Sequence, residues 1–137
     1  MPRDTFVIVV HALVFNASGH LLLLRRTNTG VMDGLSAPPG GHRQPNERLL
    51  DTAIRESREE ACINITAAHP VAALPFATGI NFLFQATDWH GTPQIGEPSR
   101  CDHLCFVNPR ALPTNTVPWL APTLALRNQG RWYKDFT

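Results

Sequence analysis

Three of the chain's 11 acidic side chains crowd into RESREEACI, a stretch that spans residues 55–63. They are Glu56, Glu59 and Glu60. At about 100° per residue, these positions project from one side of a helix, where their negative charges repel one another. Two interpretations follow. Either Arg55 and Arg58 neutralise the carboxylates, in pairs such as Arg55–Glu59, or the carboxylates share a bound cation.

Oxygen ligands gathered at one point are typical of a site for a hard divalent cation. Mg²⁺ keeps several of its waters and shares its coordination with substrate phosphates. Upstream, Gly40 and Gly41 let the backbone approach a ligand closely, and their carbonyl groups are further oxygen donors. These surroundings shift the balance from a solvated helix face towards a metal site.

A helix is the element that must present the glutamates. From Glu47 to Ala61 the sequence has no helix breaker, and apolar or small residues recur at spacings of three and four. Asn46 is a good N-cap, and Glu47 places negative charge where the helix dipole favours it. We therefore expect a helix over residues 47–61.

Strands are expected where β-branched and aromatic residues gather. They cover residues 5–15, 20–26, 63–74, 80–89 and 101–107. The turn NASG at 16–19 joins the first two as a hairpin. A second helix is expected over 117–129, with Pro118 and Pro122 disturbing its first turns. Strands and helices in this order predict a mixed sheet flanked by helices.

Length, charge and cysteine content limit the classes of protein. A chain of 137 residues is long enough for one domain with its own core. The formal net charge of +1 argues against a long basic groove, so we expect small anionic substrates and no extended nucleic acid. Three cysteines without a C-x-x-C pair favour a reducing compartment, and the apolar run FVIVVHALVF is too short to span a bilayer. A cytoplasmic protein without membrane contact is expected.

The charged residues also follow a fixed spacing. The string GHRQPNERLLDTAIRESREEACI, residues 41–63, resembles the Nudix box G-x5-E-x7-R-E-U-x-E-E-x-G-U, in which U is a bulky aliphatic residue. The matching letters are Gly41, Glu47, Arg55, Glu56, Glu59 and Glu60. Ser57 replaces an aliphatic residue, and Cys62 replaces the glycine that ends the helix. A buried hydroxyl without a partner costs about 1 kcal/mol. A left-handed cysteine costs about 1–2 kcal/mol, so either this strain is tolerated or the helix ends differently.

The resemblance to Nudix hydrolases implies an α/β fold, an α/β/α sandwich with a mixed sheet, formed by residues 1–137 as a single domain. It also implies an enzyme that uses Mg²⁺ or Mn²⁺ to hydrolyse a nucleoside diphosphate linked to another group. Carried over to this chain, the implied metal ligands are Glu56, Glu59, Glu60 and the carbonyl of Gly40. Glu47 and Arg55 would brace the loop and helix that present these ligands.

The implied chemistry has a physical basis. Divalent cations neutralise the diphosphate, align it and lower the pKa of a bound water, so that hydroxide attacks phosphorus. A carboxylate must then accept the proton of that water. Glu56 is our first choice for this role.

Outside the box, short segments of the chain resemble segments of those family members that cut nucleoside triphosphates to monophosphate and pyrophosphate. The strand LLLLRR offers Arg26 for a substrate phosphate, and Gly41 and His42 are further candidates for phosphate contact. In WHGTPQIGE, Glu97 follows a W-x-G-x-P turn and is a further candidate metal ligand. In LPTN, Asn115 offers an amide that both donates and accepts, as base recognition requires. The implied partner is a small nucleotide, bound by a monomer or a homodimer.

Other functions stay open. An ADP-ribose or nucleotide-sugar hydrolase uses the same box, and NTGVMDGLSAPPGGH resembles another Nudix subgroup. A non-catalytic nucleotide-binding regulator on the same fold usually loses box carboxylates, which this chain keeps. Cys101, His103 and Cys105 alternate along a predicted strand, but their spacing favours a half-buried strand over a zinc site.

Overall fold

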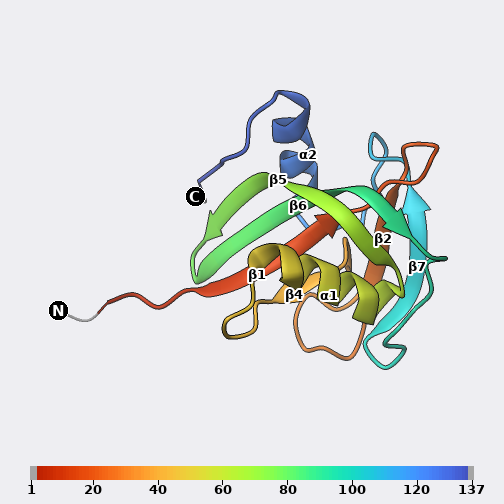
Figure 1. The fold of residues 1–137 in the computed structure, drawn as a ribbon, viewed down its shortest axis with the longest axis horizontal. Helices are drawn as coiled ribbons and strands as arrows, with labels where there is room; N and C mark the ends of the chain where they lie inside the picture. The colour runs from red at the N-terminus through yellow and green to blue at the C-terminus, as the bar shows by residue number, and fades with distance from the viewer. Residues whose placement is uncertain (1–2, 136–137) are drawn as a thin grey trace.

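The computed structural model describes residues 3–135 (Figure 1). Its elements are β1 (Val7–Leu13), β2 (Leu21–Arg26), β3 (Ser36–Ala37), β4 (Gly40–His42), α1 (Leu49–Ala61), β5 (Asn64–Phe76), β6 (Gly79–His90), β7 (Cys101–Val107) and α2 (Leu120–Asn128). No helix in this part of the chain has both the length and the apolar character needed to cross a bilayer.

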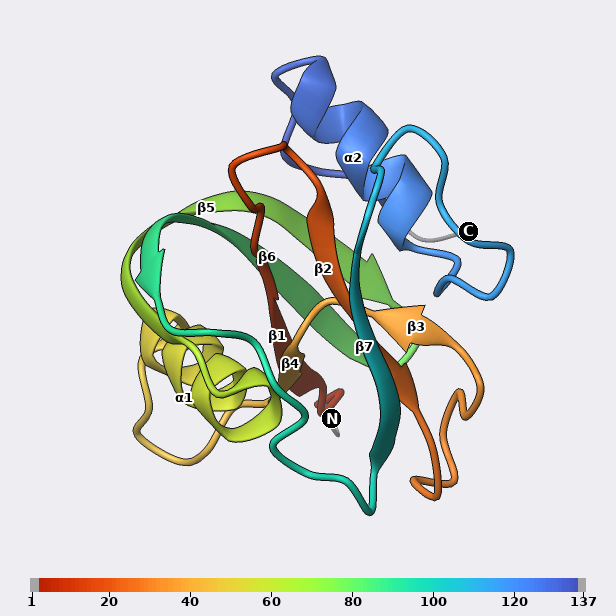
Figure 2. The same cartoon turned by 90° about the vertical axis from the view of Figure 1, so that its right-hand side faces the viewer.

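Within the described residues the strands form two sheets. The first has the order β4-β1-β6-β5 and is mixed, because β1 runs parallel to β6 while the other pairs are antiparallel. The second has the order β3-β2-β7 and is antiparallel. The helices α1 and α2 lie on different sides of these sheets (Figure 2). The predicted α/β class, with a mixed sheet flanked by helices, is confirmed.

Alternate residues of β1 face two hydrophobic cores. Val10 and Ala12 belong to a core that also contains Ala53 of α1. Leu13 belongs to a second core, which contains Leu124 of α2. Because side chains of a strand point alternately to opposite faces, β1 separates the helix that carries the glutamates from the C-terminal helix.

Only the start of the predicted hairpin forms, with backbone hydrogen bonds from Asn16 to His20 and from Leu22 to Val14, and β2 itself does not pair with β1. After the turn at 16–19, a bridge joins Phe15 to Leu21, and β2 then pairs with β3 and β7 in the second sheet. Its leucines, residues 21–24, are all buried and alternate between the two cores. A strand that is apolar on both faces buries both of them by lying between the two cores. This position explains why β2 leaves the first sheet and joins the second.

α1 begins at Leu49, two residues after the predicted start at about Glu47, and the predicted cap at Asn46 was wrong. Its N-cap is Arg48, which has extended backbone geometry and makes no side-chain capping hydrogen bond. The expected cap, Asn46, has a left-handed backbone with φ of 63°, and the chain therefore turns before the helix starts. Glu47 lies outside the helix, where its carboxylate can accept hydrogen bonds from the surrounding loop and helix.

The C-terminal end of α1 agrees with the prediction. Cys62 is the C-cap and has left-handed geometry with φ of 60° and ψ of 29°. The Ser57 side chain is fully buried, and its hydroxyl has no hydrogen-bond partner among the described residues. Both departures from the box therefore carry the local cost that the sequence predicted.

Candidate active site

Gly41 brings the carboxylates of α1 close to the first sheet. In β4 it pairs with Val10, whose side chain lies in the core on the α1 side. A Cβ atom on Gly41 would lie 2.6 Å from Oε1 of Glu56. The absence of a side chain at this position therefore makes room for the Glu56 carboxylate.

Arg55 forms the centre of a saturated hydrogen-bond network. Its Nε and Nη2 donate to the two oxygens of Glu47 at 2.8 and 3.1 Å. Its Nη1 donates to Glu56 at 2.8 Å and to Glu59 at 3.2 Å, and Nη2 also donates to the carbonyl of His42 at 3.0 Å. A guanidinium group has five N–H donors. These bonds use all of them, so Arg55 has no donor left for another carboxylate.

Glu47 is held at several points, as expected of a brace. Its Oε1 accepts hydrogen bonds from the Thr52 hydroxyl at 2.7 Å and from the backbone N–H of Gln44 at 3.1 Å. The hydrogen bonds from Arg55 lower the pKa of Glu47 from 4.5 to about 2, because they favour its charged form. The ionised pair of Glu47 and Arg55 ties the loop before α1 to the helix.

Glu56 and Glu60 form a largely but not fully buried pair of carboxyl groups. They lie one helical turn apart and within hydrogen-bonding reach of each other. Burial raises the pKa of Glu60 to about 8 despite a hydrogen bond from the N–H of Gly40 at 2.9 Å, and the charge of Glu56 adds to the rise. Burial also raises the pKa of Glu56, against the effect of Arg55. The pair therefore shares a proton near neutral pH.

The carbonyl of Gly40 points to the same side as these carboxylates. Backbone hydrogen bonds across β1 and β4 join Ala12 to Pro39 and Ile8 to Arg43. Hydrogen-bonded and non-hydrogen-bonded residue pairs alternate along antiparallel strands. The pair of Gly40 and His11 is a non-hydrogen-bonded one, so the N–H and the carbonyl of Gly40 both point away from β1. Its N–H meets Glu60, and its carbonyl is therefore directed towards the α1 side as well.

Glu59 is the most exposed of the three box glutamates. Its side chain is 46% exposed, against 14% for Glu56, and it makes the predicted ion pair with Arg55. Within residues 3–135, no three Asp, Glu, His or Cys side chains already converge as a metal centre. The structure thus groups Glu56 with Glu60 and Gly40, while Glu59 lies on the arginine side.

The donor set nevertheless fits a hard divalent cation. The carboxylates of Glu56 and Glu60 and the carbonyl of Gly40 are all oxygen donors, which Mg²⁺ and Mn²⁺ prefer. Among the described residues, Glu60 forms no ion pair with an arginine, lysine or histidine. A buried carboxyl in this position needs either a proton or a cation. The residues present therefore suit the ion implied by the sequence resemblance.

The loop between β6 and β7 brings Glu97 to this cluster. The N–H of Gly96 donates to the carbonyl of Glu60 at 2.9 Å, and a Cβ atom on Gly96 would collide with the carbonyl oxygen of Glu59. The charge of Glu97 adds the smallest of the named contributions to the raised pKa of Glu60. Sequence reasoning missed Gly96, although a glycine next to a candidate ligand was a usable signal.

Arg26 and Asn115 meet at the loop after β2. The N–H of Gly34 donates to the carbonyl of Arg26 at 2.8 Å, and Nδ2 of Asn115 donates to the carbonyl of Gly34 at 3.2 Å. Nε of Arg26 also donates to the carbonyl of Val31 at 2.8 Å. The side chains of these two substrate-contact candidates therefore bond to the same loop, at Val31 and at Gly34.

His42 lies apart from the carboxylates. Because Gly41 faces α1, the exposed side chain of His42 points to the opposite face of the strand. The face opposite α1 also carries His11, whose Nδ1 lies 2.8 Å from Oδ1 of Asn81 and whose ring lies 4.6 Å from that of Trp119. Burial lowers the pKa of His11 to about 4, so the ring is neutral. Sequence reasoning selected His42 and had no signal for His11.

Fold and site together define the class of this protein. A glutamate-bearing helix is packed on a mixed sheet, with an arginine that joins the loop before the helix to the helix itself. The model of the NUDIX domain family matches residues 5–126, which include both sheets and the glutamate cluster. The chain belongs to the Nudix hydrolase family.

One relative of known name is similar in sequence over most of this chain. It is 41% identical over 136 residues to the m7GpppN-mRNA hydrolase NUDT17 of Bos taurus. The match covers 90% of this chain and 44% of that protein, so the chain spans less than half the length of this relative.

Solved structures share the fold at lower identity. The MutT protein of Methanosarcina mazei has a TM-score of 0.84 at 20% identity and covers 94% of this chain and 97% of its own. The MutT NUDIX hydrolase of Burkholderia pseudomallei has a TM-score of 0.80 at 22% identity, with 89% and 98% covered. An ADP-ribose pyrophosphatase of Streptococcus suis has a TM-score of 0.66 at 24% identity, with 97% and 100% covered. At these identities the likeness supports the fold alone.

Proposed function

We propose that residues 1–137 act as a single domain that hydrolyses a nucleoside diphosphate linked to another group, with Mg²⁺ or Mn²⁺ as cofactor. The observation that carries this proposal is the state of Glu60. It is a buried carboxyl beside Glu56 and Gly40 for which Arg55 has no donor left. Such a group can exchange its proton for a divalent cation.

Each candidate residue has a role in this proposal. The metal ligands would be Glu56, Glu59, Glu60, Glu97 and the carbonyl of Gly40. The bound ions would neutralise the diphosphate and lower the pKa of a water molecule. Glu59 can join them by giving up its hydrogen bond with Arg55, which at 3.2 Å is the longest that this guanidinium makes.

Glu56 is the proposed acceptor of the proton from the attacking water. Burial raises its pKa in the absence of an ion, and a carboxylate within hydrogen-bond reach of the attacking water can accept its proton. Arg55 holds one oxygen of Glu56 at 2.8 Å, and Glu47 in turn holds Arg55. Glu47 and Arg55 therefore act by positioning Glu56.

The first candidate substrate is a nucleoside triphosphate, cut to monophosphate and pyrophosphate. The meeting of Arg26 and Asn115 at one loop supports this candidate, because one side chain suits a phosphate and the other suits a base. Gly41 is the remaining proposed contact of the phosphates, whereas the side chain of His42, the other sequence candidate, points to the opposite face of β4. A small nucleotide, a cytoplasmic location and a monomer or homodimer stay predictions.

A capped RNA end is the second candidate substrate. The relative that is 41% identical over 90% of this chain is an m7GpppN-mRNA hydrolase, and its substrate also contains a nucleoside diphosphate linked to another group. The same metal site would serve both candidates, because both reactions break a phosphoanhydride bond.

A turnover screen with Mg²⁺ tests the proposal. The panel contains normal and oxidised triphosphates, m7GpppG, ADP-ribose and nucleotide sugars, and the products identify the bond that is cut. We expect Glu60→Gln to lose activity at least about 100-fold. Asp51→Asn, on an exposed face of the same helix, is the matched control and should keep it. Absence of turnover for every compound, or equal rates for both variants, would show that the proposal is wrong.

A further inference from the structure

A cleft lies at the far end of the molecule, away from the glutamate cluster. Its volume is about 890 Å³, within the usual range for sites that hold small molecules. It is formed by the turn after β1, by β6, by the segment after β7 and by α2. Its lining includes Phe15, His20, Gln85, Asn108, Arg110 and Arg127.

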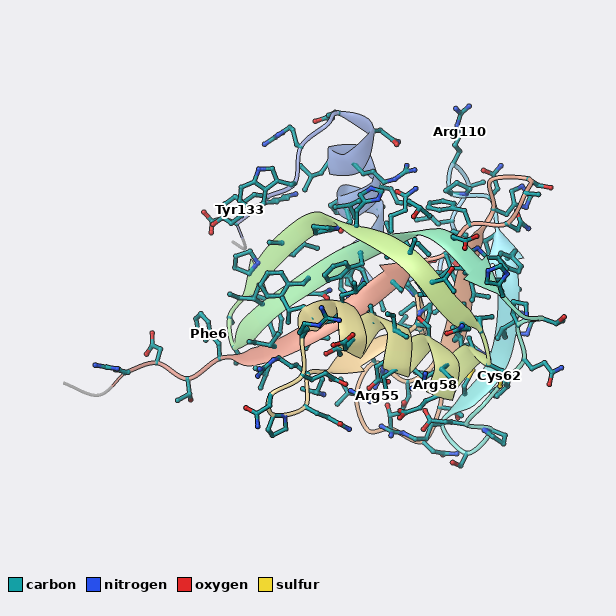
Figure 3. The ribbon with its side chains drawn as sticks, in the orientation of Figure 1. Phe6, Arg55, Arg58, Cys62, Arg110 and Tyr133 are labelled. Carbon is teal, nitrogen blue, oxygen red and sulfur yellow. The ribbon has the colours of Figure 1, made fainter. Side chains whose placement is uncertain are left out.

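This cleft is remote from the glutamates. At one end of the second sheet, Leu21 pairs with Val107, beside the cleft. At the other end, Arg26 pairs with Cys101, close to the loop that carries Glu97. The length of β2, about 20 Å, therefore separates the two sites. Figure 3 shows the corresponding separation between Arg110 and Arg55.

Arg127 is held in the cleft by neutral groups. Its Nε donates to the Gln85 side chain at 2.6 Å, and Nη1 donates to Asn128 at 3.1 Å. Its guanidinium carbon lies 5.0 Å from the centre of the Phe15 ring, in the range of a cation–π contact. The side chain is half-buried and, among the described residues, forms no ion pair. These bonds use two of the five guanidinium donors, and the rest stay available.

The charge of the cleft has one sign. Arg110 stands at its rim, exposed, and the lining contains no aspartate or glutamate. Asn108 and Asn128 add amide groups to the same surface. A guanidinium group is planar and can donate two parallel hydrogen bonds to a phosphate. A fixed guanidinium group with free donors is therefore suited to bind one.

We propose that this cleft is a second binding site, which takes phosphate groups of a nucleotide or a short oligonucleotide through Arg110 and Arg127. The limited number of arginines fits a short anion, in agreement with a net charge of only +1. The site does not depend on the glutamate cluster. Its phosphates belong either to the RNA part of a capped substrate or to a separate nucleotide ligand.

Fluorescence anisotropy with a labelled 5′-phosphorylated hexauridylate tests the site. EDTA is present, so that divalent cations do not support binding at the glutamates. We expect Arg127→Gln and Arg110→Gln each to weaken binding at least about threefold, and to reduce the slope of log K against log salt by about 0.7 per lost phosphate contact. Arg131→Gln, which removes an exposed charge outside the lining, is the control and should change binding less than about twofold.

Equal binding by all three variants would overturn the proposal. Because Arg127 also holds Gln85 and Phe15, its variant is checked by circular dichroism, and the exposed Arg110 gives an independent result. Hydrolysis then identifies the source of the phosphates. A raised KM of Arg110→Gln for a capped hexanucleotide but not for m7GpppG indicates substrate RNA. Unchanged KM values with lost hexauridylate binding indicate a separate ligand. Failure of hydrolysis altogether affects only the proposed function.

Discussion

The pair of Glu56 and Glu60 predicts that binding of a divalent cation releases a proton. With the pKa of Glu60 raised to about 8 by burial, the pair carries about 0.9 of a proton at pH 7 before the ion binds. The ion and the proton compete for the same carboxylates. Affinity for the ion must therefore rise as pH rises towards 8, and level off above it.

The magnitude follows from competition with one proton. The apparent Kd for Mn²⁺ should fall about ninefold between pH 6 and pH 7, about fivefold more between pH 7 and pH 8, and less than about twofold from pH 8 to pH 9. Proton release should be about 0.9 per ion at pH 7 and about 0.1 at pH 9. Isothermal titration calorimetry in two buffers of different ionisation enthalpy measures both quantities.

Variants on the same helix separate this linkage from general effects of pH. Glu60→Gln should bind Mn²⁺ weakly and with little proton release, whereas Asp51→Asn should behave as the parent protein. A parent protein that binds Mn²⁺ equally well at pH 6 and pH 8, without releasing protons, would refute the reasoning. Glu60 would then be ionised already, and its burial would not raise its pKa.

Three other predictions concern the support of the site. Ser57→Ala removes a buried hydroxyl without a partner and should raise the free energy of unfolding by about 1–2 kcal/mol, seen as a Tm increase of about 4–8 °C. Thr123→Val, which removes a satisfied hydroxyl, is the contrast and should lower Tm. Gly41→Ala places a Cβ atom 2.6 Å from Glu56 and should reduce kcat/KM about 100-fold, more than any loss of Tm explains. The contribution of Glu47 to stability, whose pKa is lowered from 4.5 to about 2, is complete above pH 4.5 and disappears as pH falls through 2. When the free energy of unfolding is measured as pH is lowered, Glu47→Gln should not show this loss of stability.

The sequence predicted those features that depend on local spacing. The helix and the common side of Glu56 and Glu60 follow from residues that are close along the chain. The sequence left the end at Cys62 open, and the structure shows that the left-handed geometry is kept. The choice of Gly41 as a phosphate contact stays a prediction. The structure adds a steric reason for a glycine at this position, because a Cβ atom there would lie 2.6 Å from Oε1 of Glu56.

Features that depend on distant parts of the chain could not be predicted in this way. The assignment of β2 to a second sheet depends on its burial between two cores, which its leucines alone do not reveal. The start of α1 depends on the hydrogen bonds of Glu47 with Arg55, which compete with capping by Asn46. The contact between Gly96 and α1 depends on how the loop before β7 folds back.

The two interpretations of the glutamate cluster apply to different carboxylates. Arg55 neutralises Glu47 and offsets the charges of Glu56 and Glu59, as the first interpretation expects. Its donors are then exhausted, and Glu60 is left to a proton and a backbone N–H. Arg55 thereby leaves the cluster with a single unbalanced negative charge, which a proton can neutralise when no cation is bound. Because a neutral Glu60 costs less to bury than an ionised one, we expect the protein to fold without an ion, and we expect its affinity for the ion to depend on how easily that proton leaves.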